Sequence, residues 1–399
     1  MNDIGTNHSV RPSILQQIAS VMRVELREVV TDSGVALIML FAIFIYATLY
    51  GLAYGSEVLR DVPIAVVDEG HTPSSRRLAA ALGEGPNVEI AFEAQDMEQA
   101  RRLLYEREIY GVVYIPADYE RSLLGGGQAT VAVYCDASYF LIYRQALEQI
   151  VATLTATGAM IELRRLVAQG RELQQAAAVS EPIIYESQML FNPYLGYGTF
   201  VMPAIFIVII QQTLLMGIGI VGGTWRERRS RDKDGTLVLQ IRSKTALFIG
   251  KVATYFVVSG GVAALALTIP YYLLGYPMHG SVWVVTALVV PYILACVMLG
   301  ILLSTLFRHR EDPVLWLLWS SIPILMLSGV SYPRNAMPEV LVALGALLPS
   351  SHAIEAFIRV RDMGASLVEI VPSIVVLSVQ TAVYGLCAAL ALRLPKKKV

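Results

Sequence analysis

The densest group of reactive side chains lies in one basic segment, residues 222–251. Ser230 and Lys233 have the spacing of a serine–lysine nucleophile pair, but chance easily produces such a match in a segment so rich in basic residues. Gly250 and Lys251 lack the first glycine and the following serine or threonine that a phosphate-binding loop requires. Cysteines and histidines are too scattered for a metal site. We therefore predict no catalytic residue, no metal and no bound cofactor, so a partner must supply the energy for any work.

The composition is typical of an integral membrane protein. Of the 399 residues, 55% are hydrophobic and only 16% are charged, against roughly 25% charged in an average domain. The net charge of −1 gives no indication of a nucleic-acid partner. The first apolar run begins near residue 34 and is too long for the apolar core of a signal peptide. We therefore expect an uncleaved chain embedded in a lipid bilayer.

Six apolar segments are predicted to cross the membrane, since crossing the hydrocarbon core takes about 20 apolar residues. They are residues 34–55, 197–221, 248–274, 282–307, 313–330 and 367–392. Short basic segments between spans stay in the cytoplasm, which orients the segment between the second and third spans. Its basic residues are Arg226, Arg228, Arg229, Arg231, Lys233, Arg242, Lys244 and Lys251. The same orientation puts Arg308, Arg310 and the basic tail 393–399 in the cytoplasm, so both termini are expected there.

Residues 56–196 have the character of an α/β domain inserted between the first and second spans. Strands expected at 62–67, 88–92, 111–115 and 130–135 alternate with helices at 74–82, 96–108 and 117–124. This alternation predicts a sheet covered by helices, with Asp96 as an N-cap. A long helix over 139–169 should follow, with an apolar stripe formed by Tyr143, Leu147, Ile150, Val151, Leu154, Gly158 and Ile161. This stripe would pack either on the domain, which is the favoured alternative, or on a partner's copy. The predicted topology puts this domain outside the cytoplasm.

Two further segments are expected to lie along the membrane. Residues 1–33 contain an amphipathic helix at 13–30, whose apolar face would rest on the cytoplasmic surface. A helix that caps a soluble domain is the alternative. Residues 331–366 contain prolines among apolar residues, and their apolar run is too short to cross. They predict re-entrant or surface helices on the outer side, because irregular backbone at membrane depth must be buried in protein.

Gln211 and Gln212 are adjacent amides inside the predicted span 197–221. Amides at that depth either bond to a neighbouring helix or face a polar passage. The first alternative is the commoner one. The second makes both residues candidates for a translocation path.

The order of these parts resembles the membrane subunit of ABC-2 type (type V) ABC exporters, in the drug-exporter-like branch. The likeness covers nearly the whole chain and rests on order more than on any single motif. In the predicted outer domain, residues 110–119 and 123–127 are similar to that branch, and Phe191-Asn192-Pro193 matches its entry into the second span. The coupling loop, predicted over 222–247, resembles it through Trp225, Arg226, Glu227, Arg228, Asp234, Gly235 and Thr236. The outer re-entrant segment resembles it through Gly329, Pro333, Pro338 and Pro349.

The resemblance implies a polytopic α-helical membrane protein with six transmembrane helices and an inserted extracytoplasmic α/β domain. It implies a permease in the bacterial inner (plasma) membrane that forms a homodimeric or heterodimeric pore. A separate ABC ATPase subunit, which uses ATP and Mg²⁺, would bind at the coupling loop. A periplasmic membrane fusion protein is a further partner that the outer domain suggests. These expectations define a transport subunit rather than an enzyme.

Two other functions compete with the exporter. A membrane-anchored extracytoplasmic receptor or scaffold would need only its outer domain and an anchor, yet six spans exceed what anchoring requires. An ion-coupled secondary transporter would place ionisable residues near the membrane midplane. The predicted spans carry no Asp, Glu, Lys or Arg near their centres, so the exporter is favoured.

Overall fold

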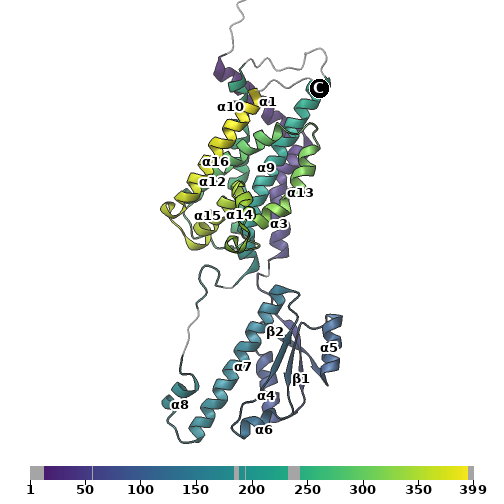
Figure 1. Cartoon of the computed structure of the whole chain (residues 1–399), viewed down its shortest axis with the longest axis vertical. Helices are drawn as coiled ribbons and strands as arrows, with labels where there is room; N and C mark the ends of the chain where they lie inside the picture. Colours follow the sequence, from purple (N-terminus) through teal and green to yellow (C-terminus); the bar gives the residue numbers. More distant parts are fainter. Residues whose placement is uncertain (1–12, 56, 184–187, 194, 232–242, 394–399) are drawn as a thin grey trace, which may run out of the picture. The chain divides into compact units, whose positions relative to one another are not determined.

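The structure is a computed structural model that describes residues 13–55, 57–183, 188–193, 195–231 and 243–393. The chain divides into two compact units, which Figure 1 shows. The helical unit is formed by Met1–Glu57 and Met189–Val399, and the α/β unit by Val58–Gln188.

The α/β unit is built on a four-stranded sheet with the strand order β2-β1-β3-β4. β1 is parallel to β2 and β3, and β4 is antiparallel to β3. The strands are β1 (Val62–Asp68), β2 (Val88–Ala94), β3 (Gly111–Ile115) and β4 (Ala132–Cys135). The helices are α4 (Pro73–Gly83), α5 (Met97–Glu106), α6 (Tyr119–Leu124), α7 (Phe140–Ala168) and α8 (Leu173–Ser180). Every strand predicted from the sequence is therefore present, with ends shifted by at most two residues.

Helices cover both faces of this sheet (Figure 1). β1 is apolar from Val62 to Val67, because its alternate residues pack into the cores on the two faces of the sheet. Ile64 and Val66 pack with α4 and α7, whereas Ala65 and Val67 pack with α5. Asp96 caps α5 as predicted, since its side chain accepts a hydrogen bond from Gln99 N at 2.7 Å.

The stripe predicted along the long helix is only partly buried. Ile150 is fully buried, but Val151 is 48% exposed, and a Cβ at Gly158 would meet nothing within 4 Å. Val151 follows the buried Ile150 and is turned about 100° around the helix from it, away from the core that Ile150 and Leu154 contact. Packing on the domain therefore does not hold for Val151 and Gly158, and packing of this part of the stripe on a partner's copy stays a prediction.

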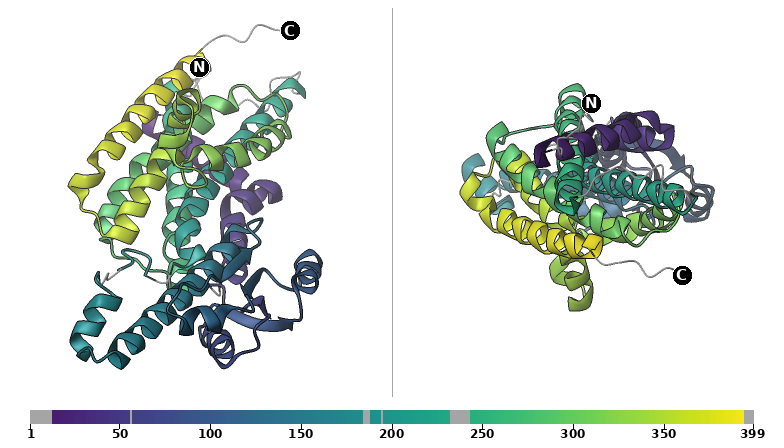
Figure 2. Two further views of the ribbon diagram at one scale, coloured as in Figure 1. Left: turned by 60° about the horizontal axis from the view of Figure 1, so that its bottom comes forward. Right: turned by 90° about the horizontal axis from the view of Figure 1, so that it is seen from above.

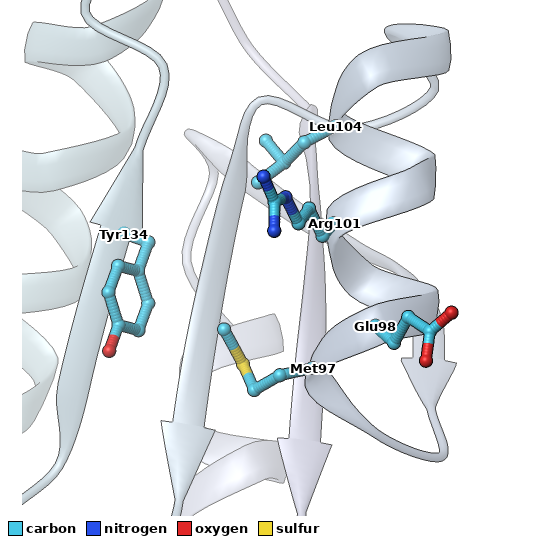
Figure 3. Close-up of a pocket in the computed structure, with 5 residues that line it drawn as sticks. All are labelled: Met97, Glu98, Arg101, Leu104 and Tyr134. Carbon is cyan, nitrogen blue, oxygen red and sulfur yellow. The ribbon is translucent and has the colours of Figure 1, made fainter.

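The face of the sheet on which α5 packs is not fully covered beside β4. A shallow hollow of about 480 Å³ is lined there by Met97, Glu98, Arg101, Leu104 and Tyr134. Met97, Arg101 and Leu104 point from α5 toward the strand that carries Tyr134, and the Glu98 carboxylate points away (Figure 3). The hollow contains none of the site residues predicted from the sequence.

Among its described residues, the helical unit contains five helical segments long and apolar enough to cross a membrane. They are Ser33–Ala53, Tyr197–Arg228, Lys244–Leu273, Val282–Ser304 and Leu367–Leu392. The elements are α1 (Ile14–Thr31), α2 (Ser33–Ala36), the π-helix η1 (Leu37–Phe41), α3 (Ala42–Ala53), α9 (Tyr197–Arg231), α10 (Lys244–Ala266), α11 (Ile269–Leu274), α12 (Val282–Ser304), α13 (Asp312–Leu327), the 3₁₀ helix η2 (Arg334–Ala336), α14 (Glu339–Ala346), α15 (Pro349–Met363) and α16 (Leu367–Arg393).

The segment predicted as a span over 313–330 forms α13, which has only 16 residues. It covers about 24 Å, less than the hydrocarbon core of about 30 Å. α13 ends here because Ser328 is its C-cap and Gly329 has a φ of +93°, a backbone conformation that glycine adopts easily. α14 and α15 are long and apolar enough to cross a membrane only when they are taken together, and the two helices are bent by 88° relative to each other. The count of six spans therefore stays a prediction.

α9 is the central helix of the unit. Of its most apolar stretch, 83% is buried within the protein, against 22–50% of the corresponding stretches in the other candidate spans. It packs against α12, α13, α15 and α3, and Figure 1 shows it between α12 and α13. A helix that is apolar all round is expected in such a buried position.

Candidate functional site

Polar residues from several helices meet at the end of the helical unit where α9 ends. We call this group the basic-end cluster: Glu25, Glu28, Asp32, Arg226, Glu227, Arg228, Lys251, Tyr255, Arg310 and Asp312. In the view along the long axis, α1 is seen from its side as it lies across this end (Figure 2, right).

α1 is attached to α10 by a buried acid. The Glu25 side chain is 4% exposed, and its Oε1 lies 2.5 Å from Lys251 Nζ. Its Oε2 accepts a hydrogen bond of 2.6 Å from the Tyr255 hydroxyl. A buried charge is tolerated when it is paired and hydrogen-bonded in this way. Gly250 lets the two helices approach closely, because a Cβ there would lie 2.6 Å from Val21 Cβ.

The sequence pattern around Glu25 indicates that this acid has a partner within the protein, which the prediction missed. Val21 and Val29 are buried on the same face of α1, four residues before and after Glu25. An acid within an apolar stripe requires a partner when the stripe is covered by protein. The predicted helix is present as α1 and its buried stripe contacts α10, while its position on the membrane surface stays a prediction.

The last turns of α9 contain the residues predicted to couple to an ATPase. Trp225, Arg226, Glu227 and Arg228 were expected in a loop, but α9 continues to Arg231. That prediction was wrong for residues 222–231, because arginine and glutamate favour helix and no proline interrupts the run. The other predicted coupling residues, Asp234, Gly235 and Thr236, lie outside the described residues.

These α9 side chains bond to other elements of the same chain. Arg226 donates to Ser304 O at the end of α12, and Arg228 pairs with Glu28 of α1 at 2.6 Å. Glu227 Oε1 accepts from Arg310 N at 2.8 Å. The end of α9 is therefore joined to α1, α12 and the connection between α12 and α13.

The α12–α13 connection is tied to the start of the first span. Asp32, which caps α2 by accepting from Gly34 N, also lies 3.1 Å from Arg310 Nη2. Asp312 Oδ2 accepts from Arg308 N at 2.7 Å and from His309 N at 2.9 Å. Glu28 and Asp32 were not among the predicted site residues, because their partners Arg228 and Arg310 are 200 and 278 residues away. Asp312 was also missed, although its bonds are local.

Glycines make the contact between α9 and this connection possible. A Cβ on Gly223 would lie 2.4 Å from His309 O and 2.9 Å from Arg310 Cα, and one on Gly222 would lie 2.9 Å from Ser304 Cβ. Main-chain atoms thus occupy the space of a side chain at Gly223, and the Ser304 side chain occupies it at Gly222. The cluster therefore combines close backbone contact with ion pairs between its elements.

Gln211 and Gln212 both bond to neighbouring backbone, as expected for amides at that depth. Gln211 is fully buried, and its Oε1 accepts from Ser350 N at 2.9 Å. Gln212 Nε2 donates to Leu317 O of α13 at 2.9 Å. Each amide also has one atom, Gln211 Nε2 or Gln212 Oε1, without a hydrogen-bond partner in the part of the chain that is described. A role in a translocation path stays a prediction.

The predicted re-entrant residues lie along the bent pair and its approach. Gly329 ends α13, Pro333 precedes η2, Pro338 is the N-cap of α14, and Pro349 is the first residue of α15. Proline suits these places because it has no backbone N–H, and the first N–H groups of a helix have no partner within the helix.

The break between α14 and α15 is held by side chains from α9 and α16. Ala346 O accepts from Gln380 Nε2 at 2.9 Å and lies 3.0 Å from His352 Nε2. Leu347 O accepts from the Tyr384 hydroxyl at 2.5 Å, and Gln211 receives the Ser350 N–H. Backbone groups freed by the bend therefore have partners, which irregular backbone at membrane depth requires.

Replacing Gln211 with leucine is expected to loosen this break locally. The Ser350 N–H would lose its acceptor, so its amide should exchange with solvent about tenfold faster. Hydrogen exchange of peptides from 345–353, followed by mass spectrometry in lipid nanodiscs, measures this rate. Gln212→Leu is the matched control, because Gln212 bonds to α13 instead. An equal increase in both variants would contradict the assignment.

Comparison with known proteins gives the family. The model of the ABC-2 family transporter proteins matches residues 33–390. The inner membrane transport permease YhhJ of Escherichia coli is 24% identical over 356 residues, covering 86% of this chain and 87% of that protein. The probable multidrug ABC transporter permease YbhR of the same organism is 23% identical over 384 residues, covering 94% and 98%. The permease YbhS is 21% identical over 336 residues, covering 82% and 84%.

These matches confirm the resemblance deduced from the order of the segments. They extend over almost the entire chain and over most of each relative. Together with the apolar helices, they support a multi-pass inner membrane transport subunit rather than an enzyme. The chain belongs to the ABC-2 transporter family as a permease.

Proposed function

We propose that this chain is the permease of an ATP-driven exporter and that a separate ABC ATPase acts on the basic-end cluster. The observation that carries the proposal is the joining of α1, α9, α10 and the α12–α13 connection by buried or short ion pairs. A displacement of any of these elements would move several spans at once. Export driven from one end of the unit needs such a connection.

The ATPase would bind ATP and Mg²⁺, and this chain would bind neither. Trp225, Arg226, Glu227 and Arg228 would position the end of α9, while Asp234, Gly235 and Thr236 would contact the ATPase surface. α9 has 35 residues and therefore a length of about 52 Å. As one buried helix, it would transmit movement from the cluster to the opposite end of the unit.

The proposed topology follows the distribution of basic residues. The basic-end cluster faces the cytoplasm, both termini lie there, and the α/β unit is extracytoplasmic. If the bent pair α14–α15 is re-entrant on the outer side, six crossings require α13 to cross despite its 16 residues. Local thinning of the bilayer or snorkelling of flanking residues would accommodate its length.

A second permease copy would complete a dimeric pore, identical or not to this chain. Gln211 and Gln212 would lie beside the translocation path, and the bent pair α14–α15 would close its outer end. A periplasmic membrane fusion protein is proposed as the partner of the α/β unit. The receptor and the secondary transporter gain no support, since the relatives carry permease names.

Co-purification from native membranes tests the proposal directly. The chain, tagged at its C-terminus and extracted in mild detergent, should bring down a stoichiometric soluble subunit with a phosphate-binding loop, identified by mass spectrometry. Repeated absence of such a subunit under conditions that preserve weak complexes would overturn the proposal.

A charge swap tests whether the ATPase acts through the internal ion pairs. Arg228→Glu is expected to lower the ATPase rate of the assembled complex several-fold, because two acids would face each other at the α1–α9 contact. The double variant Glu28→Arg with Arg228→Glu restores the pair and should recover most of the rate. A single variant with an unchanged rate, or a double variant without recovery, would contradict a role for this pair.

A further inference from the structure

α1 carries a second apolar stripe besides the one that packs on α10. Its residues recur at spacings of three and four and therefore share one side of the helix. We call them the outer stripe: Leu15, Ala19, Met22, Leu26 and Val30. Leu15 is 73% exposed, Leu26 47% and Val30 59%. The described part of this chain therefore leaves much of an apolar surface uncovered along the length of α1.

The outer stripe points away from the charged end of α9. Leu26 directly follows the buried Glu25, so the stripe is turned about 100° from the face that contacts α10. Glu28 comes two residues after Leu26 and lies about 200° further around the helix, on the nearly opposite side. Glu28 pairs with Arg228 in the last turns of α9. Because α1 lies across this end of the unit, the stripe is on the side where a bilayer around the apolar helices lies.

Two arginines border the outer stripe. Arg23 directly follows Met22 and Arg27 directly follows Leu26, so both lie about 100° beyond the stripe, on the side away from α10. Both residues are exposed, and neither makes an ion pair among the described residues. The two acids of α1 are already paired with basic residues of α9 and α10. The unpaired charge of α1 is therefore positive.

An apolar stripe with arginines along one border fits a lipid surface. Such a helix lies with its apolar side at the boundary between headgroups and acyl chains and its basic residues near the phosphates. The side chains of the outer stripe offer no hydrogen bond to a folded partner such as the ATPase. Exposed apolar side chains also continue into the first candidate span, where Leu37 is 54% and Phe41 57% accessible.

The arginines decide which lipid is favoured. A guanidinium forms two parallel hydrogen bonds with a phosphate group. A zwitterionic headgroup carries its own cation beside the phosphate, whereas an anionic headgroup has a net charge that attracts each arginine. With no acid left on α1 to neutralise Arg23 and Arg27, this attraction is not offset within the helix.

We propose that the outer stripe, Arg23 and Arg27 form a binding surface for anionic phospholipids of the surrounding bilayer. The sequence predicted a single apolar face at the membrane surface. The structure instead has that face against α10 and leaves a second face for lipid. Lipid would then hold α1 from one side while Lys251 and Tyr255 of α10 hold Glu25 from another. The proposal does not rest on the proposed function, because this binding requires no ATPase.

Quenching by spin-labelled lipids in nanodiscs tests the surface. A fluorophore is attached to Ala19→Cys in the full chain, after removal of the accessible thiols by Cys135→Ala and Cys387→Ala. Phosphatidylcholine nanodiscs contain the same fraction of either spin-labelled phosphatidylglycerol or spin-labelled phosphatidylcholine. We expect the anionic quencher to be enriched about fivefold at the fluorophore. Combined Arg23→Gln and Arg27→Gln should bring the two quenchers close to equality.

Two controls separate the surface from general effects. Arg308→Gln removes an exposed charge from the α12–α13 connection at the same end of the unit, and it should leave the preference unchanged. A fluorophore at Ser20→Cys, one residue from Ala19 and on the side of α1 that carries Glu28, should be quenched several-fold less by either lipid.

Three results would overturn the proposal. Absence of quenching at Ala19→Cys by either lipid would assign the outer stripe to a protein partner, such as a second copy of the chain. Equal quenching by the two lipids in the wild type would show apolar contact without selection by charge. A preference that survives the loss of both arginines would place the selection elsewhere. None of these results affects co-purification of the ATPase, so the two proposals can fail separately.

Discussion

Gly223→Ala is expected to prevent the α9 end from docking and to destabilise the helical unit. The new Cβ would lie 2.4 Å from His309 O, 2.7 Å from His309 C and 2.9 Å from Arg310 Cα. These are main-chain atoms, which cannot rotate away as a flexible side chain can. Overpacking of a tight contact costs about 1–3 kcal/mol, and here the shift would also separate Glu227 from Arg310 N.

The same substitution elsewhere in the unit should have the opposite sign. A Cβ on Gly260 or Gly261 of α10 would meet nothing within 4 Å. Alanine favours a helix over glycine by about 1 kcal/mol, so Gly260→Ala should be neutral or stabilising. The fraction of monodisperse protein that survives heating in detergent measures the difference. Equal behaviour of the two variants would show that the α9 contact is not tight in solution.

Glu25→Ala is expected to be the most damaging change in the ion-pair network. Lys251, whose side chain is only 17% exposed, would be left without its acid, and the Tyr255 hydroxyl would lose its acceptor. Breaking a buried pair from one side costs about 3–5 kcal/mol, and the residual exposure of Lys251 favours the lower end. Equilibrium unfolding in detergent micelles should show the loss.

Two comparisons separate the charge effect from general damage. Glu28→Ala breaks the pair with Arg228, whose side chain is 48% exposed, and should cost under about 1 kcal/mol. Glu25→Leu combined with Lys251→Met removes both charges and should recover most of the stability. A double variant no better than Glu25→Ala would mean that Glu25 acts through shape and not through its charge.

The sequence predicted the elements whose pattern is local. The strands of the α/β unit were found because β1 is apolar on both faces and because turn residues bound each strand. The apolar helices were found by length and hydropathy. Asp96 was identified as a cap because the interaction spans three residues. In each case the deciding contacts lie within one element.

The candidate site depends on contacts that no local pattern contains. Glu25 and Lys251 are 226 residues apart in the sequence, so nothing in either neighbourhood names the other. The end of α9 was predicted as a loop because charge usually marks a loop between spans, whereas here the charged residues bond to other helices. Hydropathy extended the fifth span to residue 330, although Gly329 at a positive φ ends α13 earlier.

The bond between Glu57 O and Tyr197 N also has an evolutionary consequence. Glu57, the last residue of the helical unit before the α/β unit, and Tyr197, the first residue of α9, have backbones 3.0 Å apart, so the α/β unit, Val58–Gln188, is inserted between two neighbouring parts of the helical unit. Insertions of this kind are well tolerated, because the host needs no adjustment beyond the junction. Selection can therefore lengthen, exchange or remodel the α/β unit while the machinery in the bilayer keeps its fold.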